Sequence, residues 1–246
     1  MLTHPDELRV RIWRGDAGGG EMAAYRAPRL PNQTVLDVVT WIQRHQAPDL
    51  SYRFSCRVGM CGSCAMTVNG APRWTCRTHV KEVARNRRDG QLELAPLRNL
   101  PVVKDLVCDM ADFFRKWRQA EGRFRGGRGR FDAVSAVTAA DPHRAAADAA
   151  IECINCAVCY AACDVVAWNP GYLGPAALNR AWTLVNDARD TAQSRRLRAI
   201  ADAGGGCQHC HSQHHCAQYC PVQLSPAHSI AGLKRRVGRA VLRGEL

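Results

Sequence analysis

Long apolar runs are missing from this sequence. Within its 246 residues no stretch of about 18 consecutive apolar residues occurs, so we expect no segment that spans a lipid bilayer. The N-terminal residues MLTHPDELRVRIWRGD have no apolar core like that of a secretory signal peptide, so we expect no secretory leader. Acidic residues are scarce too, with 22 Asp and Glu against 34 Lys and Arg, a formal net charge of +12. Disorder is not expected, because 46% of the residues are hydrophobic.

Cysteine, in contrast, is abundant. The chain has 13 cysteines, and an odd number cannot pair completely into disulfides. Its length suits one or two domains of about 150 residues each, which excludes a small disulfide-stabilised scaffold. The thiols are therefore expected in a reducing compartment, where metal binding is the first hypothesis for their role.

The N-terminal part of the chain is predicted to be rich in strands. Leu8, Val10 and Ile12 occupy every second position, as in a strand with one buried face. Thr34 is suited to cap the helix that follows it. Further strands are expected over residues 21–26, 65–68 and 91–95.

The C-terminal part is predicted to be helical. Apolar residues recur at helical spacing from Val103 to Trp117, and the helix they predict carries Cys108. A last helix is expected to begin at Ser225-Pro226. The Gly- and Arg-rich segment 122–132 is interpreted as a solvated or partner-facing loop. An RNA-binding role for it is disfavoured, because no aromatic stacking surface accompanies it.

Four cysteines in the first third have the spacing of plant-type 2Fe–2S ferredoxins, C-x4-C-x2-C and a fourth further on: Cys56, Cys61, Cys64 and Cys76. The loop must curl tightly to bring three thiolates onto two irons. Gly59 and Gly62 permit the positive φ that such a curl needs. A zinc site is the alternative, but zinc prefers paired C-x2-C motifs.

Two later cysteine groups have the spacing of bacterial ferredoxins, in which the fourth cysteine of a run ligates the other cluster. Crossing the two runs gives one complete 4Fe–4S ligand set: Cys153, Cys156, Cys159 and Cys220. The other set lacks one thiolate, because Gln213 occupies the second ligand position. Its three remaining cysteines are predicted to hold a 3Fe–4S cluster: Cys163, Cys210 and Cys216.

Two cysteines remain outside these sets. Cys108 is interpreted as a packed, inert thiol. Cys207 precedes Cys210 at C-x2-C spacing and is an alternative fourth ligand that would turn the third cluster into 4Fe–4S. The cross-ligation pattern is complete without Cys207, which favours the 3Fe–4S assignment.

With these motifs the chain resembles the iron–sulfur subunit of succinate dehydrogenase and fumarate reductase, the succinate:quinone oxidoreductases of respiratory complex II. The matching segments keep the family's order and cover nearly the whole chain: SCRVGMCGSCAMTVNG (55–70), NLPVVKDLVCDM (99–110), ECINCAVCYAAC (152–163), WNPGYLGPAAL (168–178) and CHSQHHCAQYCP (210–221). The resemblance implies an α+β fold. A β-grasp 2Fe–2S ferredoxin-like domain over residues 1–103 would precede an all-helical bacterial-ferredoxin-like domain over residues 104–246, which holds the 4Fe–4S and 3Fe–4S clusters.

The resemblance implies an electron relay of the respiratory chain and the tricarboxylic acid cycle. Electrons would pass from the FAD of a separate flavoprotein, which holds the dicarboxylate site, through the 2Fe–2S, 4Fe–4S and 3Fe–4S clusters to a membrane quinone. In fumarate reduction the flow would be reversed. The other implied partners are membrane anchor subunits, with or without haem b, and no nucleic acid is expected to bind. The chain would lie peripherally on the cytoplasmic face of a bacterial inner membrane.

Two residues correspond to the family's quinone pocket near the third cluster. The Trp168 indole N–H can donate to a quinone carbonyl, and the His211 imidazole can take part in proton delivery. Asp164 and Ala167 depart from the proline and the second aromatic residue that the family often has there. Both departures bear on the shape of the pocket and on the preferred quinone. The nearby histidines at positions 209, 214 and 215 are interpreted as exposed polar residues.

Two alternatives from other functional classes remain. One is the iron–sulfur subunit of a different flavoenzyme complex, of a heterodisulfide-reductase-like or glycolate-oxidase-like kind. The plant-type site, fused to a cross-ligated pair of clusters with Trp168 and His211 beside it, argues against it. The other is a basic zinc protein that binds nucleic acid, which would be colourless where a cluster protein is brown.

Overall fold

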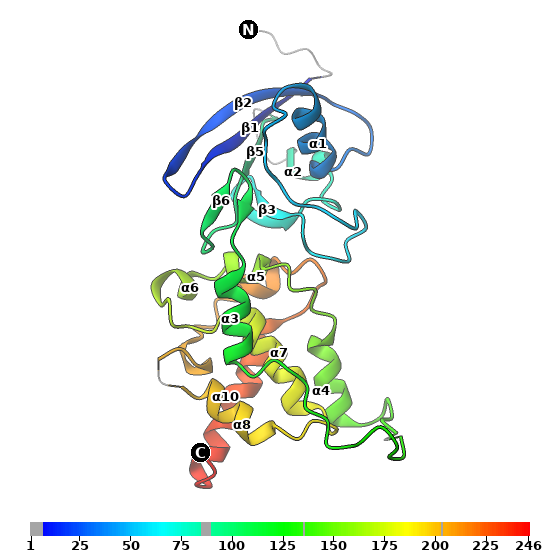
Figure 1. The fold of residues 1–246 in the computed structure, drawn as a ribbon, viewed down its shortest axis with the longest axis vertical. Coiled ribbons are helices and arrows are strands. Elements are labelled where there is room, and N and C mark those ends of the chain that lie inside the picture. Colours follow the sequence, from blue (N-terminus) through cyan, green and yellow to red (C-terminus); the bar gives the residue numbers. More distant parts are fainter. Residues whose placement is uncertain (1–6, 85–89, 135, 203) are drawn as a thin grey trace. The chain divides into compact units, whose positions relative to one another are not determined.

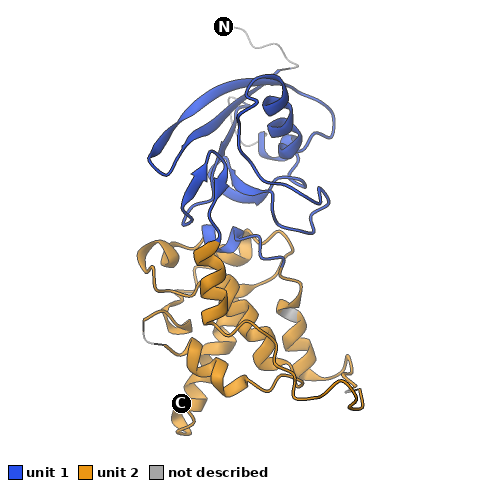
Figure 2. Ribbon diagram, viewed as in Figure 1, with its two compact units in different colours: residues 1–110, 154–161 blue, residues 111–153, 162–246 orange. Residues whose placement is uncertain are grey.

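The structure is a computed structural model that describes residues 7–84, 90–134, 136–202 and 204–246. The chain divides into two compact units, which Figure 2 colours separately. Unit 1 comprises residues 1–110 and 154–161, and unit 2 comprises residues 111–153 and 162–246. The start of the expected first domain, residues 1–6, and residues 85–89 lie outside the described residues. The domain division at residues 103 and 104 stays a prediction.

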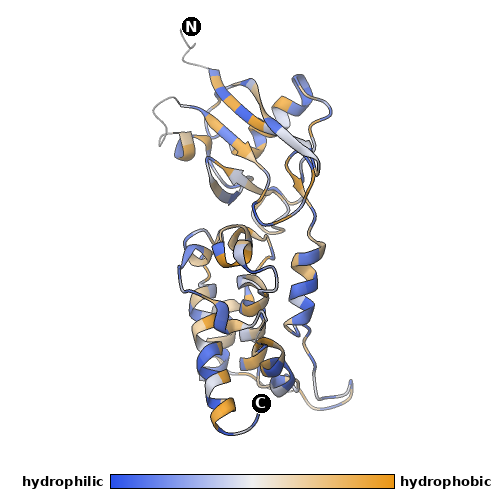
Figure 3. Cartoon of the chain, turned by 90° about the vertical axis from the view of Figure 1, so that its left-hand side faces the viewer, coloured by the Kyte–Doolittle hydropathy of each residue, from blue (hydrophilic) through white to orange (hydrophobic). Residues whose placement is uncertain are grey.

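Unit 1 is built on a mixed sheet in the order β4-β3-β5-β1-β6-β7, with β2 also paired to β1. Strand β1 runs antiparallel to β2 and parallel to β5, and β3 is antiparallel to both β4 and β5. The described strands are β1 (Glu7–Asp16), β2 (Gly19–Pro28), β3 (Ala65–Val68), β4 (Ala71–Trp74), β5 (Leu92–Ala95), β6 (Val102–Lys104) and β7 (Val107–Cys108). The alternation predicted for the first strand is confirmed, since Leu8, Val10 and Ile12 are buried. Figure 3 shows apolar and polar residues alternating along the strands of this unit.

Helix α1 (Val35–His45) covers the core of this sheet. Thr34 caps it as predicted, because its side chain accepts a hydrogen bond from Asp37 N while Asp37 bonds back to Thr34 N. Val38 and Ile42 of the helix are fully buried in the cluster that includes the apolar face of β1. A short helix, α2 (Val80–Ala84), adds Val80 and Val83 to the same core.

The helix expected from Val103 to Trp117 is formed only in its second part, as α3 (Ala111–Gln119), and over residues 103–110 the prediction was wrong. This stretch forms the β6–β7 ribbon, and Cys108 lies in its second strand. Asp105 at the turn has a left-handed φ of +49°, which a helix does not allow, and its buried carboxylate accepts from Arg14 Nε at 3.0 Å. Cys108 is nonetheless buried, with Sγ 3.6 Å from the carbonyl oxygen of Leu97.

Unit 2 is helical, with the buried helix α7 at its centre and α4 and α10 packed against it (Figure 1). Ser225 caps α10 and Pro226 occupies its first turn, so the predicted start of the last helix is confirmed. The helices described in this unit are α3 (Ala111–Gln119), α4 (Pro142–Ile151), α6 (Asp164–Trp168), α7 (Pro175–Asn186), α8 (Gln193–Ile200), η1 (Cys207–His209), α9 (His215–Gln218) and α10 (Pro226–Leu242). Helix α5 (Val158–Ala161) belongs to unit 1.

A buried ion pair anchors the segment after α3. Arg196 of α8 and Asp190 are both inaccessible to solvent, with Nη1 and Oδ1 2.9 Å apart. The same guanidinium donates to the carbonyl oxygen of Glu121, and Asp190 Oδ2 accepts from Arg125 N. The ion pair thus fixes the start of the Gly- and Arg-rich segment, while residues 123–132 are exposed. Among the described residues, no helix has the length and apolar character that a membrane crossing requires.

Candidate metal centres

The first candidate centre lies in the curled loop that precedes β3. Arg57, Gly59 and Gly62 have left-handed φ values of +59°, +76° and +71°. Two of the three are glycines, which adopt this conformation without steric cost. A β-carbon at Gly59 would lie 2.8 Å from the ring of Trp74, so the loop also packs closely against β4.

This curl aims backbone N–H groups at the first thiol. Met60 N and Cys61 N lie 3.2 and 3.3 Å from Cys56 Sγ. Hydrogen bonds from Val58, Met60 and Cys61 lower the pKa of Cys56 to about 6. Cys56 is therefore mainly a thiolate at neutral pH, the form in which cysteine ligates iron.

Two further thiols of this centre lie deep in unit 1. Cys64 and Cys76 are 3% and 5% exposed and pack with Leu36 of α1. Cys76 N lies 3.4 Å from Cys64 Sγ, and Thr75 Oγ1 donates to the Cys64 carbonyl at 2.8 Å. Burial and the neighbouring Cys64 raise the pKa of Cys76 to about 11. A bound metal cation would offset this burial cost, because coordination holds a thiol deprotonated.

The donor set of this loop fits the 2Fe–2S cluster that the spacing predicts. Four thiols come from two segments, and backbone amides point at sulfur, as in the hydrogen bonding that tunes iron–sulfur sites. Within the part of the chain that the structure describes, no three Cys, His, Asp or Glu side chains converge closely enough for a single metal ion. The fit therefore rests on the curl and on the donors.

The second group of cysteines begins in a segment of unit 1. Cys156 is half-buried and Cys159 is 9% exposed in residues 154–161. Asn155 and Ala157 have left-handed φ values of +53° and +61°, so the segment curls on either side of Cys156. The remaining two predicted ligands, Cys153 and Cys220, belong to unit 2, where Leu224 N lies 3.3 Å from Cys220 Sγ.

The third candidate centre is a cavity within unit 2. The sulfur-bearing residues Cys163, Cys210 and Cys216 line it together with Gln213. Its empty volume, including the open mouth, is about 340 Å³. Burial, and then the neighbouring Cys163 and Cys210, raise the pKa of Cys216 to about 12. Three thiols and an amide around one cavity are a donor set with one thiolate too few for a complete cube, as the sequence predicts.

Cys207 lies apart from this donor set. Its side chain is fully buried in η1, and it is not among the described residues that line the cavity. Burial raises the pKa of Cys207 to about 11. The structure thus favours Gln213 over Cys207 as the group beside the three thiols.

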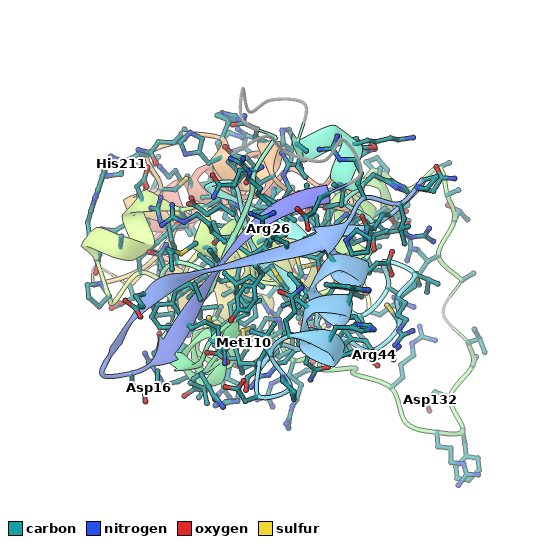
Figure 4. The ribbon with its side chains drawn as sticks, turned by 90° about the horizontal axis from the view of Figure 1, so that it is seen from above. Asp16, Arg26, Arg44, Met110, Asp132 and His211 are labelled. Carbon is teal, nitrogen blue, oxygen red and sulfur yellow. The ribbon has the colours of Figure 1, made fainter. Side chains whose placement is uncertain are left out.

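Trp168 and His211 come together although 43 positions separate them in the sequence. Their rings meet edge to face, with centroids 6.0 Å apart. Trp168, at the end of α6, is 64% exposed, while His211, labelled in Figure 4, also lines the thiol cavity. An exposed indole beside this imidazole gives one N–H donor and one proton-exchanging group at the mouth of the third centre.

Three contacts near the third centre escape the sequence prediction. Tyr172 is fully buried and lines the cavity, and burial followed by the charges of the three thiols raises its pKa. Lys234 Nζ donates to the carbonyl oxygen of Cys210 at 2.7 Å. Asp164 Oδ2 lies 3.9 Å from His215 Nδ1. The glycine-flanked aromatic in WNPGYLG is a signal that could have pointed to Tyr172, but no local pattern indicates the other two.

Comparison with protein-family models gives two matches. Residues 8–115 match a 2Fe-2S iron-sulfur cluster binding domain, and residues 149–224 match a 4Fe-4S dicluster domain. The two matched ranges contain all eleven predicted cluster ligands.

Similar proteins extend over most of the chain. The fumarate reductase iron-sulfur subunit of Mycobacterium tuberculosis is 33% identical over 224 residues, which are 86% of this chain and 83% of that protein. The succinate dehydrogenase iron-sulfur subunit of Paracoccus denitrificans is 35% identical over 92% of this chain and 86% of that protein. A chain of the Mycobacterium smegmatis Sdh1 complex in its apo form superposes with a TM-score of 0.82 at 27% identity, covering 95% of this chain and 96% of that one.

Proposed function

The chain belongs to the family of iron–sulfur subunits of succinate dehydrogenases and fumarate reductases, and on this premise we propose how its residues relay electrons. It has the 2Fe–2S and 4Fe–4S domains of an electron-transfer subunit. Dicarboxylate chemistry requires a flavin, and we assign that chemistry to a partner flavoprotein that carries FAD. The chain is thus a relay within an enzyme, with no dicarboxylate chemistry of its own.

Eleven cysteines are proposed as cluster ligands. The 2Fe–2S cluster is assigned to Cys56, Cys61, Cys64 and Cys76, the 4Fe–4S cluster to Cys153, Cys156, Cys159 and Cys220, and a 3Fe–4S cluster to Cys163, Cys210 and Cys216. The clusters supply one-electron steps, while the chain supplies thiolates and the N–H donors that stabilise them. The 4Fe–4S assignment rests on the ferredoxin spacing of its cysteines.

The single observation that carries the third assignment is the cavity that Cys163, Cys210 and Cys216 line together with Gln213. An amide side chain is a poor substitute for a thiolate ligand of iron, because clusters are held by cysteine thiolates. The fully buried Cys207 lies outside this lining. Both facts favour a 3Fe–4S cluster over a second 4Fe–4S cluster.

Trp168 and His211 are proposed to bind a quinone next to this cluster. The exposed indole would donate its N–H to a quinone carbonyl, and the imidazole would exchange a proton as the quinone is reduced. A quinone is confined to the bilayer, so we propose that membrane anchor subunits hold the chain at the cytoplasmic face of a membrane. Electrons flow from flavin to quinone in succinate oxidation and in the opposite direction in fumarate reduction.

EPR spectroscopy of the oxidised, purified complex tests the assignment. A 3Fe–4S signal is expected in the oxidised state, and a 2Fe–2S signal after reduction. Absence of the oxidised signal, with four irons in the third cluster by Mössbauer spectroscopy, would show that Cys207 or another group completes the cube.

A second test uses the isolated cluster-loaded chain. It should not oxidise succinate, and turnover by the chain alone would contradict the proposed division of labour.

A further inference from the structure

The loop of the first candidate centre touches a residue of the second. Gly62 stands between the proposed 2Fe–2S ligands Cys61 and Cys64, and its Cα faces the backbone of Cys156. A β-carbon added at Gly62 would lie 2.8 Å from Cys156 Cβ, 2.9 Å from Cys156 Cα and 3.1 Å from the carbonyl oxygen of Ile154. Two carbon atoms in contact normally lie about 3.5–4.0 Å apart, so only glycine fits this place.

Further contacts hold the segment 154–161, which carries Cys156, against the rest of unit 1. Asn99 Nδ2 lies 2.9 Å from the carbonyl oxygen of Tyr160 and 3.4 Å from that of Ala161. Helix α5 also packs against β4, the strand that precedes the fourth proposed 2Fe–2S ligand, Cys76. Gly62 therefore contacts the start of residues 154–161 and Asn99 holds their end. Both contacts lie within one compact unit.

We propose that Gly62 is a positioning residue that sets the gap between the first two clusters, and that the electron crosses at the Gly62–Cys156 contact. The inference rests on the proposed function, because it takes Cys61, Cys64 and Cys156 as ligands. The step moves one electron from the reduced 2Fe–2S cluster to the oxidised 4Fe–4S cluster. No bond forms or breaks, and no proton moves.

Close packing is what makes this contact suited to electron transfer. From a ligand of the first cluster to a ligand of the second, the route runs along one or two residues of backbone and then crosses a single van der Waals contact at Gly62. A side chain at position 62 would widen that contact, since the atoms it meets belong to the backbone and Cβ of Cys156 and cannot rotate away. Its left-handed φ of +71° disfavours any other residue as well.

The test compares two alanine variants of the intact complex. Gly62→Ala places a methyl group against Cys156, whereas Gly59→Ala places one against the side-chain ring of Trp74 in the same loop. The two glycines have nearly equal φ values, +71° and +76°, so both variants have the same backbone strain. The measurements are the spin–spin interaction between the reduced clusters by EPR relaxation, and the rate at which the 4Fe–4S cluster is reduced after rapid reduction of the 2Fe–2S cluster.

In Gly62→Ala we expect a weaker spin–spin interaction and electron transfer slowed several-fold, because both fall as the separation between the two clusters increases. In Gly59→Ala, which has the same backbone strain but no methyl group against Cys156, both measurements should change less than in Gly62→Ala. Equal behaviour of the two variants, whether both are slow or neither is, would overturn the proposal.

If Gly62→Ala fails to assemble its clusters, Asn99→Gly decides the question. This variant removes the side chain that holds residues 160 and 161 and keeps a residue suited to the left-handed φ of +64°. Slower transfer with both clusters present supports the proposal, and an unchanged rate overturns it. Absence of either cluster from the unmodified complex would instead contradict the proposed function, which keeps the two failures distinct.

Discussion

At the scale of single residues, position 213 is proposed to decide the type of the third cluster. Gln213 lines the cavity beside Cys163, Cys210 and Cys216, where a fourth ligand would stand. We predict that Gln213→Cys converts the 3Fe–4S cluster into a 4Fe–4S cluster, because it supplies the missing thiolate. The EPR signal of the oxidised complex should then disappear.

The matched control is Cys207→Ser, which removes the buried thiol outside the cavity. It should leave the oxidised EPR signal unchanged in shape and in spins per complex. If Cys207→Ser alters that signal while Gln213→Cys does not, Cys207 rather than position 213 bears on the third cluster.

Thiol reactivity in the first centre should follow the opposite shifts of two pKa values. With a pKa of about 6, Cys56 is about nine-tenths thiolate at pH 7, whereas Cys76, with a pKa of about 11, is almost wholly protonated. In cluster-free protein, iodoacetamide should therefore alkylate Cys56 before Cys76, at a rate that rises through pH 6 and then levels off. Mass spectrometry of timed samples gives both rates, and faster labelling of Cys76 below pH 9 would contradict this expectation.

The sequence shows which cysteines share a loop because spacing along the chain dictates it, and the ligand sets built on that spacing stay predictions. The curl at Gly59 and Gly62 was equally foreseeable, since a short loop around two irons needs positive φ. The approach of Gly62 to Cys156 was not, because it joins positions 94 residues apart that no local pattern relates. The contact of Lys234 with the Cys210 carbonyl oxygen escaped prediction for the same reason.

At the scale of secondary-structure elements, helix α1 depends on its cap. Thr34 and Asp37 form a reciprocal capping box, and the helix carries Leu36 against the buried thiols of Cys64 and Cys76. We predict that Thr34→Ala lowers the free energy of unfolding by about 1 kcal/mol. Urea unfolding followed by circular dichroism measures this loss. Thr138→Ala, at an exposed position outside the helices, is the control and should change the free energy by less than about 0.5 kcal/mol.

The buried ion pair between α8 and the loop before it should make stability depend on pH. Burial opposes the charge on Asp190, but Arg196 and two backbone N–H groups outweigh it and lower the Asp190 pKa below its ordinary value of 3.8. At pH 7 we predict that Asp190→Asn costs about 3 kcal/mol, because it leaves the Arg196 charge buried without its partner. The difference from the unmodified protein should shrink as the pH falls below 3.8, because the Asp190 carboxyl then binds a proton first in the unfolded chain and, at still lower pH, in the folded one.

Urea titrations at several pH values measure this difference. The partly exposed pair of Asp187 and Arg189 provides the control, since such pairs contribute about 0–1 kcal/mol. A cost for Asp190→Asn that is equal at pH 7 and pH 3 would show that the loss comes from packing and not from charge.

Sequence patterns predicted the elements unevenly. The alternation of β1 and the caps of α1 and α10 depend on neighbours in the chain, and these are found where expected. The β6–β7 ribbon was mistaken for a helix because apolar residues recur from Val103 at a spacing that a helix also allows. What decides against the helix is the contact of Asp105 with Arg14, which is 91 residues away.

At the scale of the whole molecule, cluster loading should change the net charge. The polypeptide has a formal charge of +12. Each oxidised cluster with its thiolates brings a charge of about −2, so the loaded chain has a net charge of roughly +6. We predict that removing the clusters with a chelator, without denaturing the protein, makes the chain bind more tightly to a cation exchanger. Earlier elution of the cluster-free chain at pH 7 would contradict this charge estimate.

Unit 1 is made of two separate segments of the chain, residues 1–110 and 154–161, and this division governs the order in which the chain folds during synthesis. Its sheet is complete once residue 110 has left the ribosome, but residues 154–161 emerge only after the 43 residues 111–153 of unit 2. Domains usually fold as units from the N-terminus during translation. Here the nascent first unit must wait, with the backbone face of Gly62 uncovered, until the later segment arrives. Until then the first loop is accessible from the side that Cys156 later closes.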